Sequence, residues 1–205
     1  MTADPKEVGV PVDWIRGSLP AEQYQTARKR LLTILRRRSY VEGEFVLSSG
    51  ARTTRYVDGK MTTHHPEGAF LSALLFLEAL RGDPVRAAGG PVLGSVPLAG
   101  AVDCLSYLQG RPMLTFSVRK EAKGHGTEKE IEGGPLEPGM EVALIEDVVT
   151  TGSALLWAVE KVTASGCRPV KILALVDREA GAKEKLEQHC PYRPLFLLSE
   201  LSEIS

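Results

Sequence analysis

The sequence predicts an α/β fold in which a parallel sheet is flanked by helices on both faces. From Pro84 to Leu198, short apolar runs alternate with segments of helical periodicity, and strands that alternate with helices pair in parallel. The run from Val142 to Ile145 is apolar at every position, as expected of a central strand that is buried on both faces. The length of 205 residues and the apolar content of 43% fit one domain with its own core.

The N-terminal part is predicted to be less regular than the rest. Residues 1–20 contain Pro5 and Pro11 and show little periodicity, which indicates a loose extension. From Ala21 to Arg38, apolar residues recur at helical spacing, so a helix is expected there. Next we expect two short strands within Gly43–Tyr56, around a turn at Ser48–Gly50, and a helix from about Ala69 to Leu80.

The remaining elements form the alternating pattern. The predicted strands are Pro84–Ala88, Pro112–Val118, Glu141–Ile145, Val170–Val176 and Pro194–Leu198. The predicted helices are Val96–Leu108, Gly152–Ala164 and Ala182–Gln188, and a polar loop spans Arg119–Pro138. The single domain 1–205 therefore divides into an extension (1–20), a helix with two short strands (21–60) and an α/β core (66–200).

Composition argues against several functional classes. The 25 basic and 26 acidic residues nearly cancel, so the charge does not favour general binding of nucleic acid or of a membrane surface. Met1–Ser18 is charged and lacks a long apolar run, which predicts neither a signal peptide nor a membrane span and makes the cytoplasm the default location.

The cysteines and histidines are expected to be structural. Three cysteines far apart in the chain match neither a disulfide framework nor a zinc-ligand spacing, which favours buried, reduced thiols. The histidines outside the polar loop also lack a ligand spacing, so no metal site built directly from protein side chains is expected. These residues are Cys104, Cys167 and Cys190, and His64, His65 and His189.

Unusual residues follow three of the predicted strands, at Gly89, Arg119 and Glu146. The carboxyl ends of parallel strands form the crevice in which open α/β sheets bind ligands. We therefore expect these three segments to build one site.

The segment after Ile145 has the chemistry of a ribose-phosphate site. Glu146 and Asp147 are adjacent carboxylates, and each can accept two hydrogen bonds side by side from sugar hydroxyls. The stretch Thr150–Ser153 then offers hydroxyls and backbone N–H groups at a helix N-terminus, where an anion is favoured. The alternative is an ordinary capped helix, with Asp147 or Thr150 as the N-cap and the acids in solvent.

The polar loop carries clustered cations among glycines. Lys120, Lys123 and His125 follow Arg119 within a few residues, and long loops of this kind often close over a ligand. A cationic lid would stabilise a departing pyrophosphate. A solvated loop of mixed charge is the alternative.

Four segments resemble a known family. Ala143–Leu155 resembles the phosphoribosyl pyrophosphate motif of type I phosphoribosyltransferases: an apolar strand, two acids and a Thr/Gly-rich turn. Arg119–Gly126 resembles the catalytic loop of the orotate phosphoribosyltransferases, Phe45–Lys60 their N-terminal hood over the base, and Gly89–Pro97 their pyrophosphate loop. Together with Val176–Glu179, the resemblance covers roughly Gly43 to Glu179.

The resemblance implies a reaction and its residues. Orotate and phosphoribosyl pyrophosphate would give orotidine 5′-monophosphate and pyrophosphate, a step of pyrimidine nucleotide biosynthesis, with Mg²⁺ as cofactor. Catalysis would fall to Lys123, Asp147 and Glu146, and orotate binding to Thr150 and Arg178. The implied donor-binding residues are Arg119, Lys120, Lys123, His125, Glu146, Asp147, Val148, Val149, Thr150, Thr151, Gly152, Ser153 and Ala154.

The resemblance further implies a homodimer with shared active sites. Arg119, Lys123 and His125 would contact the pyrophosphate in the partner subunit, whereas Lys120 would act in its own subunit. An arginine at position 178 suits orotate, because its fork binds a carboxylate bidentately; the alternative is a surface ion pair with Asp177 or Glu179.

The sequence departs from the family at three positions. Ser48 and Gly94 stand where some members carry lysines, and Glu146 stands where many carry aspartate. The missing cations increase the expected importance of those in the loop. Two other functions stay open: transfer to another base, such as uracil or a purine, and a non-catalytic regulator that senses the donor. Arg178 and the loop favour orotate.

Overall fold

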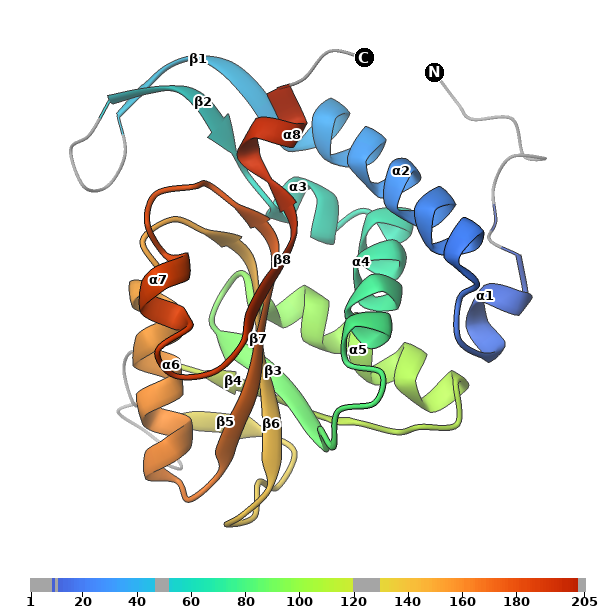
Figure 1. The fold of residues 1–205 in the computed structure, drawn as a ribbon, viewed down its shortest axis with the longest axis vertical. Coiled ribbons are helices and arrows are strands. Elements are labelled where there is room, and N and C mark those ends of the chain that lie inside the picture. The colour runs from blue at the N-terminus through green and yellow to red at the C-terminus, as the bar shows by residue number, and fades with distance from the viewer. Residues whose placement is uncertain (1–8, 10, 47–51, 120–129, 203–205) are drawn as a thin grey trace.

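In the computed structural model, residues 9, 11–46, 52–119 and 130–202 are described. Within them, a six-stranded sheet has the order β5-β4-β3-β6-β7-β8 (Figure 1). Neighbouring strands from β4 to β8 pair in parallel, and β5 joins the β4 edge antiparallel. The strands are β3 Ala87–Pro91, β4 Leu114–Val118, β5 Ile131–Gly133, β6 Glu141–Val149, β7 Arg168–Asp177 and β8 Tyr192–Leu197.

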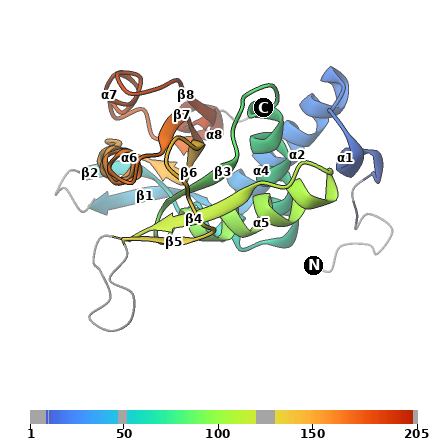
Figure 2. The ribbon, with the colours of Figure 1, turned by 90° about the horizontal axis from the view of Figure 1, so that it is seen from below.

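Helices cover both faces of this sheet, as the sequence predicts. Successive strand side chains point to opposite faces, so Ala143 and Ile145 of β6 pack with α2, α4 and α5, whereas Val142 and Leu144 pack with α6 and α7. These helices are α2 Ala21–Arg38, α4 Pro66–Ala79, α5 Ser95–Leu108, α6 Ser153–Ala164 and α7 Lys183–Leu186. Figure 2 shows β4 and β5 at one edge of the sheet, beside α5.

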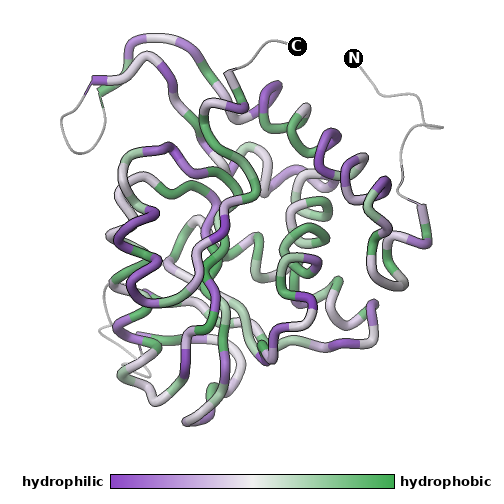
Figure 3. The backbone as a smooth tube through the Cα atoms, viewed as in Figure 1, coloured by the Kyte–Doolittle hydropathy of each residue, from purple (hydrophilic) through white to green (hydrophobic). Residues whose placement is uncertain are grey.

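The helix α2 shows how the pattern of the sequence sets the packing. Its buried residues, Ala27, Leu31 and Leu35, recur every four positions and form one face. Figure 3 shows the resulting alternation of hydrophobic and hydrophilic residues along α2. Its bounds agree with the helix predicted from the sequence.

An antiparallel hairpin stands apart from the large sheet, and we call it the hood. It consists of β1 (Tyr40–Val46) and β2 (Arg52–Val57). The short helix α3 (Lys60–Thr63) follows it directly, and the C-terminal helix α8 (Leu198–Ser202) touches it through a hydrogen bond from Arg55 to Ser202. The prediction of two short strands here is confirmed, while their turn at 48–50 lies outside the described residues.

Several local predictions are wrong. The strand expected at Pro84–Ala88 is β3, which begins and ends three residues later because β4 pairs with it from Ala87 as far as Pro91. The loop expected over Arg119–Pro138 contains β5. The extension expected over residues 1–20 contains the helix α1 (Asp13–Arg16), whose Trp14 is buried in the core.

One cysteine also differs from expectation. Cys104 is exposed, although Cys167 and Cys190 are buried free thiols as predicted. It lies on the outer side of α5, and its spacing from the buried Leu98, Val102 and Leu105 places it off the core face of that helix. In the described part of the chain, none of the helices is both long and apolar enough to cross a membrane.

Candidate active site

The acidic pair lies inside β6 rather than in a turn. The strand predicted to end at Ile145 continues to Val149, because β7 pairs with it as far as Asp177. Glu146 and Asp147 are consequently buried, with exposed fractions of 8% and 7%. The expectation of a turn beginning at Glu146 is therefore wrong, and the two carboxylates are held by the backbone of a central strand.

Backbone packs closely against both carboxylates. A Cβ atom added to Gly94 would overlap Glu146 Oε1 and Asp147 Oδ1, and one added to Gly59 would lie 2.7 Å from Asp147 Oδ2. Gly94 belongs to the glycine-rich turn after β3, and Gly59 precedes α3. Three segments far apart in the sequence thus meet at the acids.

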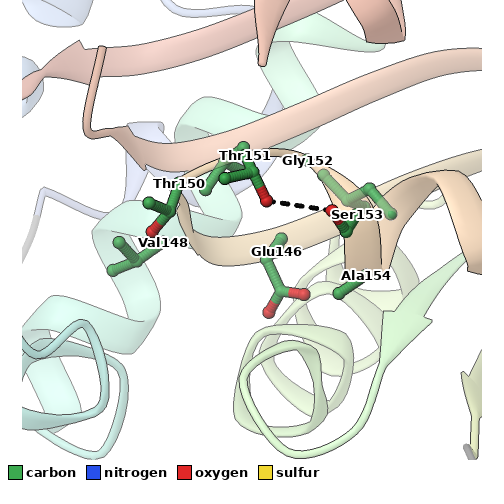
Figure 4. Close-up of a pocket in the computed structure, with 9 residues that line it drawn as sticks. Glu146, Val148, Thr150, Thr151, Gly152, Ser153 and Ala154 are labelled. Atoms are coloured by element: carbon green, nitrogen blue, oxygen red, sulfur yellow. Dashed lines mark hydrogen bonds between the residues drawn. The ribbon is translucent and has the colours of Figure 1, made fainter. Parts of the chain in front are cut away.

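The turn after β6 forms a small hollow beside Glu146. The hollow has a volume of ≈ 160 Å³ and is lined by Glu146 and residues 148–155. Gly152 has a φ of 79°, the left-handed conformation that glycine tolerates best, and this lets α6 start directly after the strand. In Figure 4 the side chains of Glu146, Thr151 and Ser153 lie around this opening, and the hydroxyls of Thr151 and Ser153 are 3.0 Å apart.

The alternative interpretation of this turn as a side-chain cap is not supported. Gly152 occupies the N-cap position of α6, and no side-chain cap hydrogen bond forms there. Asp147 Oδ1 instead accepts from the N–H of Val148, at 2.7 Å. The N–H groups at the start of α6 therefore face the hollow without a capping side chain, an arrangement that suits a phosphate.

Burial makes Glu146 a weak acid. Its desolvation, reinforced by the neighbouring Asp147 carboxylate, raises the pKa of Glu146 to about 9, and Lys60 partly offsets this. The carboxyl group therefore holds a proton at neutral pH when no ligand is present. A protonated Glu146 beside Asp147 avoids placing two buried negative charges side by side.

The raised pKa predicts a pH-dependent stability that Glu146→Gln removes. An unfolded glutamate titrates near 4.5 and the folded one near 9, so between these values the folded state binds one more proton. Stability then falls as pH rises, by up to about 1.4 kcal/mol per pH unit. Urea unfolding at pH 5.5, 7 and 8.5 should show this fall in the unsubstituted protein and a flatter profile in the variant.

The exposed Glu160 on α6 supplies the matched control. Glu160→Gln should follow the pH profile of the unsubstituted protein. Equal slopes for all three proteins would show that Glu146 does not titrate in this range.

Lys60 is a candidate that sequence reasoning missed. Its Nζ lies 2.7 Å from Asp58 Oδ1, and the hydrogen bond to Asp58, with smaller contributions from Asp147 and Tyr56, raises the pKa of Lys60. The sequence offered one indication of a role for Lys60, since it is the last residue of the segment Phe45–Lys60 that resembles a known motif. Its proximity to Asp147 depends on the close approach of Gly59 to Asp147, which no local pattern reveals.

Arg178 directly follows β7 and lies beside the turn between β6 and α6. Its backbone N–H donates to the carbonyl of Val149, at 2.8 Å, which brings it next to Thr150. Its guanidinium donates to the carbonyl of Arg55 at 3.2 Å and lies 5.7 Å from the centre of the Tyr56 ring. The contacts of Arg178 thus run to the hood.

The acids beside Arg178 have other partners. Asp177 accepts from Tyr192 Oη and from the N–H of Glu179, while the Glu179 carboxylate accepts from Ser199. The alternative in which Arg178 serves a surface ion pair with these acids is therefore not supported.

The cationic loop is described only at its base. The N–H of Arg119 donates to the carbonyl of Glu130, at 2.8 Å, and its guanidinium lies 3.5 Å from Glu132. Lys120, Lys123 and His125 lie outside the described residues, as does Ser48. Of the predicted site, the structure therefore places the residues from 146 to 154 and Arg178 together.

No metal cage accompanies these groups in the described part of the chain. Across residues 9, 11–46, 52–119 and 130–202, no group of three or more His, Cys, Asp or Glu side chains could hold a metal ion. His64 and His65 instead make local contacts with the carbonyl of Lys60 and the N–H of Gly68.

Comparisons with known proteins agree on one family. No family model matches the sequence. The chain is 39% identical over 178 residues to the orotate phosphoribosyltransferase of Synechocystis sp., covering 86% of this chain and 89% of that protein. It is 44% identical over 178 residues to that of Rhodopseudomonas palustris, covering 85% and 95%.

Solved structures give the same result. The orotate phosphoribosyltransferase of Mycobacterium tuberculosis superimposes with a TM-score of 0.76 at 36% identity, over 86% of this chain and 99% of that one. The same enzyme in complex with 5-phospho-α-D-ribosyl 1-diphosphate superimposes with a TM-score of 0.73 at 33% identity, again over 86% and 99%.

Proposed function

The chain belongs to the orotate phosphoribosyltransferase family, and we propose that the site at the ends of β6 and β7 carries out that reaction. The enzyme forms orotidine 5′-monophosphate and pyrophosphate from orotate and phosphoribosyl pyrophosphate. One observation supports the site assignment above all others: the backbone N–H of Arg178 donates a hydrogen bond to the carbonyl of Val149. An arginine that can bind a carboxylate therefore lies directly beside the turn after β6, where the phosphate would bind.

The donor would bind along the end of β6. In this proposal the hydroxyls of its ribose meet Glu146 and Asp147, and its 5′-phosphate lies in the hollow lined by Glu146 and residues 148–155. The two buried carboxylates also stabilise positive charge on the ribose ring as pyrophosphate departs. Ligand binding would favour the ionised form of Glu146, since ribose hydroxyls donate hydrogen bonds to a carboxylate.

The chemical step needs little proton transfer by the protein. The ring nitrogen of orotate gives up its proton to solvent and, in this deprotonated form, forms a bond to C1 of the ribose while the bond from C1 to the pyrophosphate oxygen breaks. The electron pair of that bond leaves with pyrophosphate. Catalysis therefore consists of positioning the two reactants and stabilising charge, and we assign Lys123, Arg119, Lys120 and His125 to the departing pyrophosphate.

We include Mg²⁺ as the companion of the donor. Mg²⁺ prefers oxygen ligands and keeps several waters, so it is commonly held through phosphates and only one or two carboxylates. Among the described residues no group of three or more His, Cys, Asp or Glu side chains could hold a metal ion, so the ion would be held chiefly through oxygen atoms of the donor, beside Glu146 and Asp147. When bound, the ion would neutralise charge on the pyrophosphate.

A homodimer with shared sites is also part of the proposal. The outer face of α5 supports it, because Val96, Cys104, Tyr107 and Leu108 are exposed there at helical spacing, with Tyr107 74% exposed. This face starts at the glycine-rich turn beside the acids.

The cellular location proposed is the cytoplasm. It is supported by two buried free cysteines, Cys167 and Cys190, since reduced thiols are typical of that compartment.

A base panel tests the acceptor. Pyrophosphate release should occur with orotate and fall below about 1% of that rate with uracil, adenine, guanine or hypoxanthine, because only orotate carries a carboxylate for Arg178. Arg178→Ala should raise the KM for orotate by about 10- to 100-fold, the effect of losing one charge-assisted pair. Turnover of another base at the orotate rate would overturn the assignment of the acceptor, and donor binding without any turnover would indicate a regulator.

A further inference from the structure

The turn that carries Arg178 is held by a buried carboxylate. Asp177 ends β7 and is only 4% exposed. Its Oδ2 accepts a hydrogen bond from Tyr192 Oη at 2.9 Å, and its Oδ1 accepts one from the N–H of Glu179 at 2.7 Å. The bond to Glu179 spans Arg178 within the turn, and the bond to Tyr192 reaches β8. Asp177 therefore links the turn that carries Arg178 to the neighbouring strand.

Glu179 confirms that this turn is tightly constrained. It has a φ of 58°, the only non-glycine residue at positive φ in the described part of the chain. Such a conformation persists only where the surroundings enforce it, and it is frequent at ligand sites. Here the enforcing contacts are the Asp177 carboxylate on its N–H and Ser199, whose N–H and hydroxyl donate to the Glu179 carboxylate at 2.8 and 3.2 Å.

The backbone of Arg178 is fixed on a third side. Its N–H donates to the carbonyl of Val149, so the peptide on each side of Arg178 has a hydrogen-bond partner. With the backbone fixed, the side chain reaches the hood at Arg55 and Tyr56. Small movements of this turn would therefore carry the guanidinium away from any base bound between β7 and the hood.

We propose that Tyr192 and Asp177 are positioning residues that hold Arg178 in register for the carboxylate of the acceptor base. The proposal rests on the proposed function, in which Arg178 binds orotate. Tyr192 stays a hydrogen-bond donor over the working pH range, because burial and the Asp177 carboxylate raise the pKa of its phenol. Selectivity for an acidic base then depends on a residue in β8 that does not itself touch the substrate.

Tyr192→Phe removes only the hydrogen bond from Tyr192 to Asp177. The ring keeps its volume, but Asp177 Oδ2 loses its buried donor. We expect the KM for orotate to rise about 5- to 20-fold while kcat at saturating orotate changes less than about two-fold. The KM for phosphoribosyl pyrophosphate should stay unchanged, because the donor's contacts lie at the end of β6. Tyr24→Phe, on α2 away from the strand ends, is the matched control and should match the unsubstituted enzyme.

A double-mutant cycle separates positioning from general damage. In the Arg178→Ala background, Tyr192→Phe should have no further effect on the orotate KM, since the group that it positions is gone. An equal rise in both backgrounds would overturn the inference and assign Tyr192 a structural role only.

The cycle also distinguishes failure of the inference from failure of the proposed function. If Arg178→Ala leaves the orotate KM unchanged, the carboxylate site itself is wrong. If Arg178→Ala raises it but Tyr192→Phe does not, only the positioning role is wrong. Should Tyr192→Phe fold poorly, Asp177→Asn serves instead: the amide keeps one oxygen for the N–H of Glu179 but loses the second carboxylate oxygen, which accepts from Tyr192. It should raise the orotate KM alone, and an unchanged KM there would contradict the inference.

Discussion

Replacing Asp147 with asparagine is expected to lower kcat/KM by about 10²- to 10³-fold without unfolding the protein. The carboxylate is 7% exposed, so its charge acts on the ribose ring with little screening by water. Asparagine keeps the shape and can still accept from the N–H of Val148. It loses the negative charge and one of the two oxygen atoms that would accept from sugar hydroxyls. Steady-state kinetics with both substrates, together with a thermal unfolding curve, measure the two effects.

The exposed Asp13 of α1 provides the control for this substitution. Asp13→Asn removes the same charge far from the strand ends and should leave kcat/KM unchanged. The proposed role of Asp147 would be contradicted by a variant that folds normally and keeps more than about one-third of the original kcat/KM.

The layers of the fold could be predicted because they depend on local periodicity. Leu31 and Leu35 recur on one face of α2, and the apolar run Val142–Ile145 identifies a buried strand. The ends of strands could not be predicted as well. Val148 and Val149 have the propensity of a strand, but they stand between two acids and a Thr/Gly-rich turn, and only the pairing with β7 shows that the strand reaches them. Likewise, Gly89–Pro91 lacks strand propensity but pairs along its whole length with β4.

The chemistry of the candidate site was predictable where it lies in one continuous segment. Glu146, Asp147 and the turn after them form such a segment, and its residue types match a sugar and a phosphate. Tyr192 and the approach of Lys60 to Asp147 were not predictable, because both depend on tertiary packing. The first partner of Lys60, Asp58, is two residues away in the sequence, whereas Asp147 and Asp177 lie far along the chain from the residues that approach them. The roles assigned to Lys120, Lys123 and His125 stay predictions.

Subunits that carry different defects are expected to restore each other's activity. Lys123→Ala and Asp147→Asn homodimers should each fall below about 1% of the original activity, since each loses one charged group from both sites. If the loop of one subunit completes the site of its partner, a hybrid dimer has one site with both defects and one site with none. Purified hybrids should then recover about half of the original kcat per dimer, a rise of more than about 50-fold.

The outcome depends on whether the loop that contains Lys123 completes the site of its own subunit or that of the partner. If Lys123 served its own subunit, each site of the hybrid would carry one defect and no activity would return. Two different affinity tags, one on each variant, allow the hybrid to be purified and its composition to be proven before assay. A hybrid of proven composition that stays inactive would contradict the shared site, while leaving the proposed transfer to orotate untouched. Recovery would instead require that Asp147 and Lys123 from different chains act on one donor molecule.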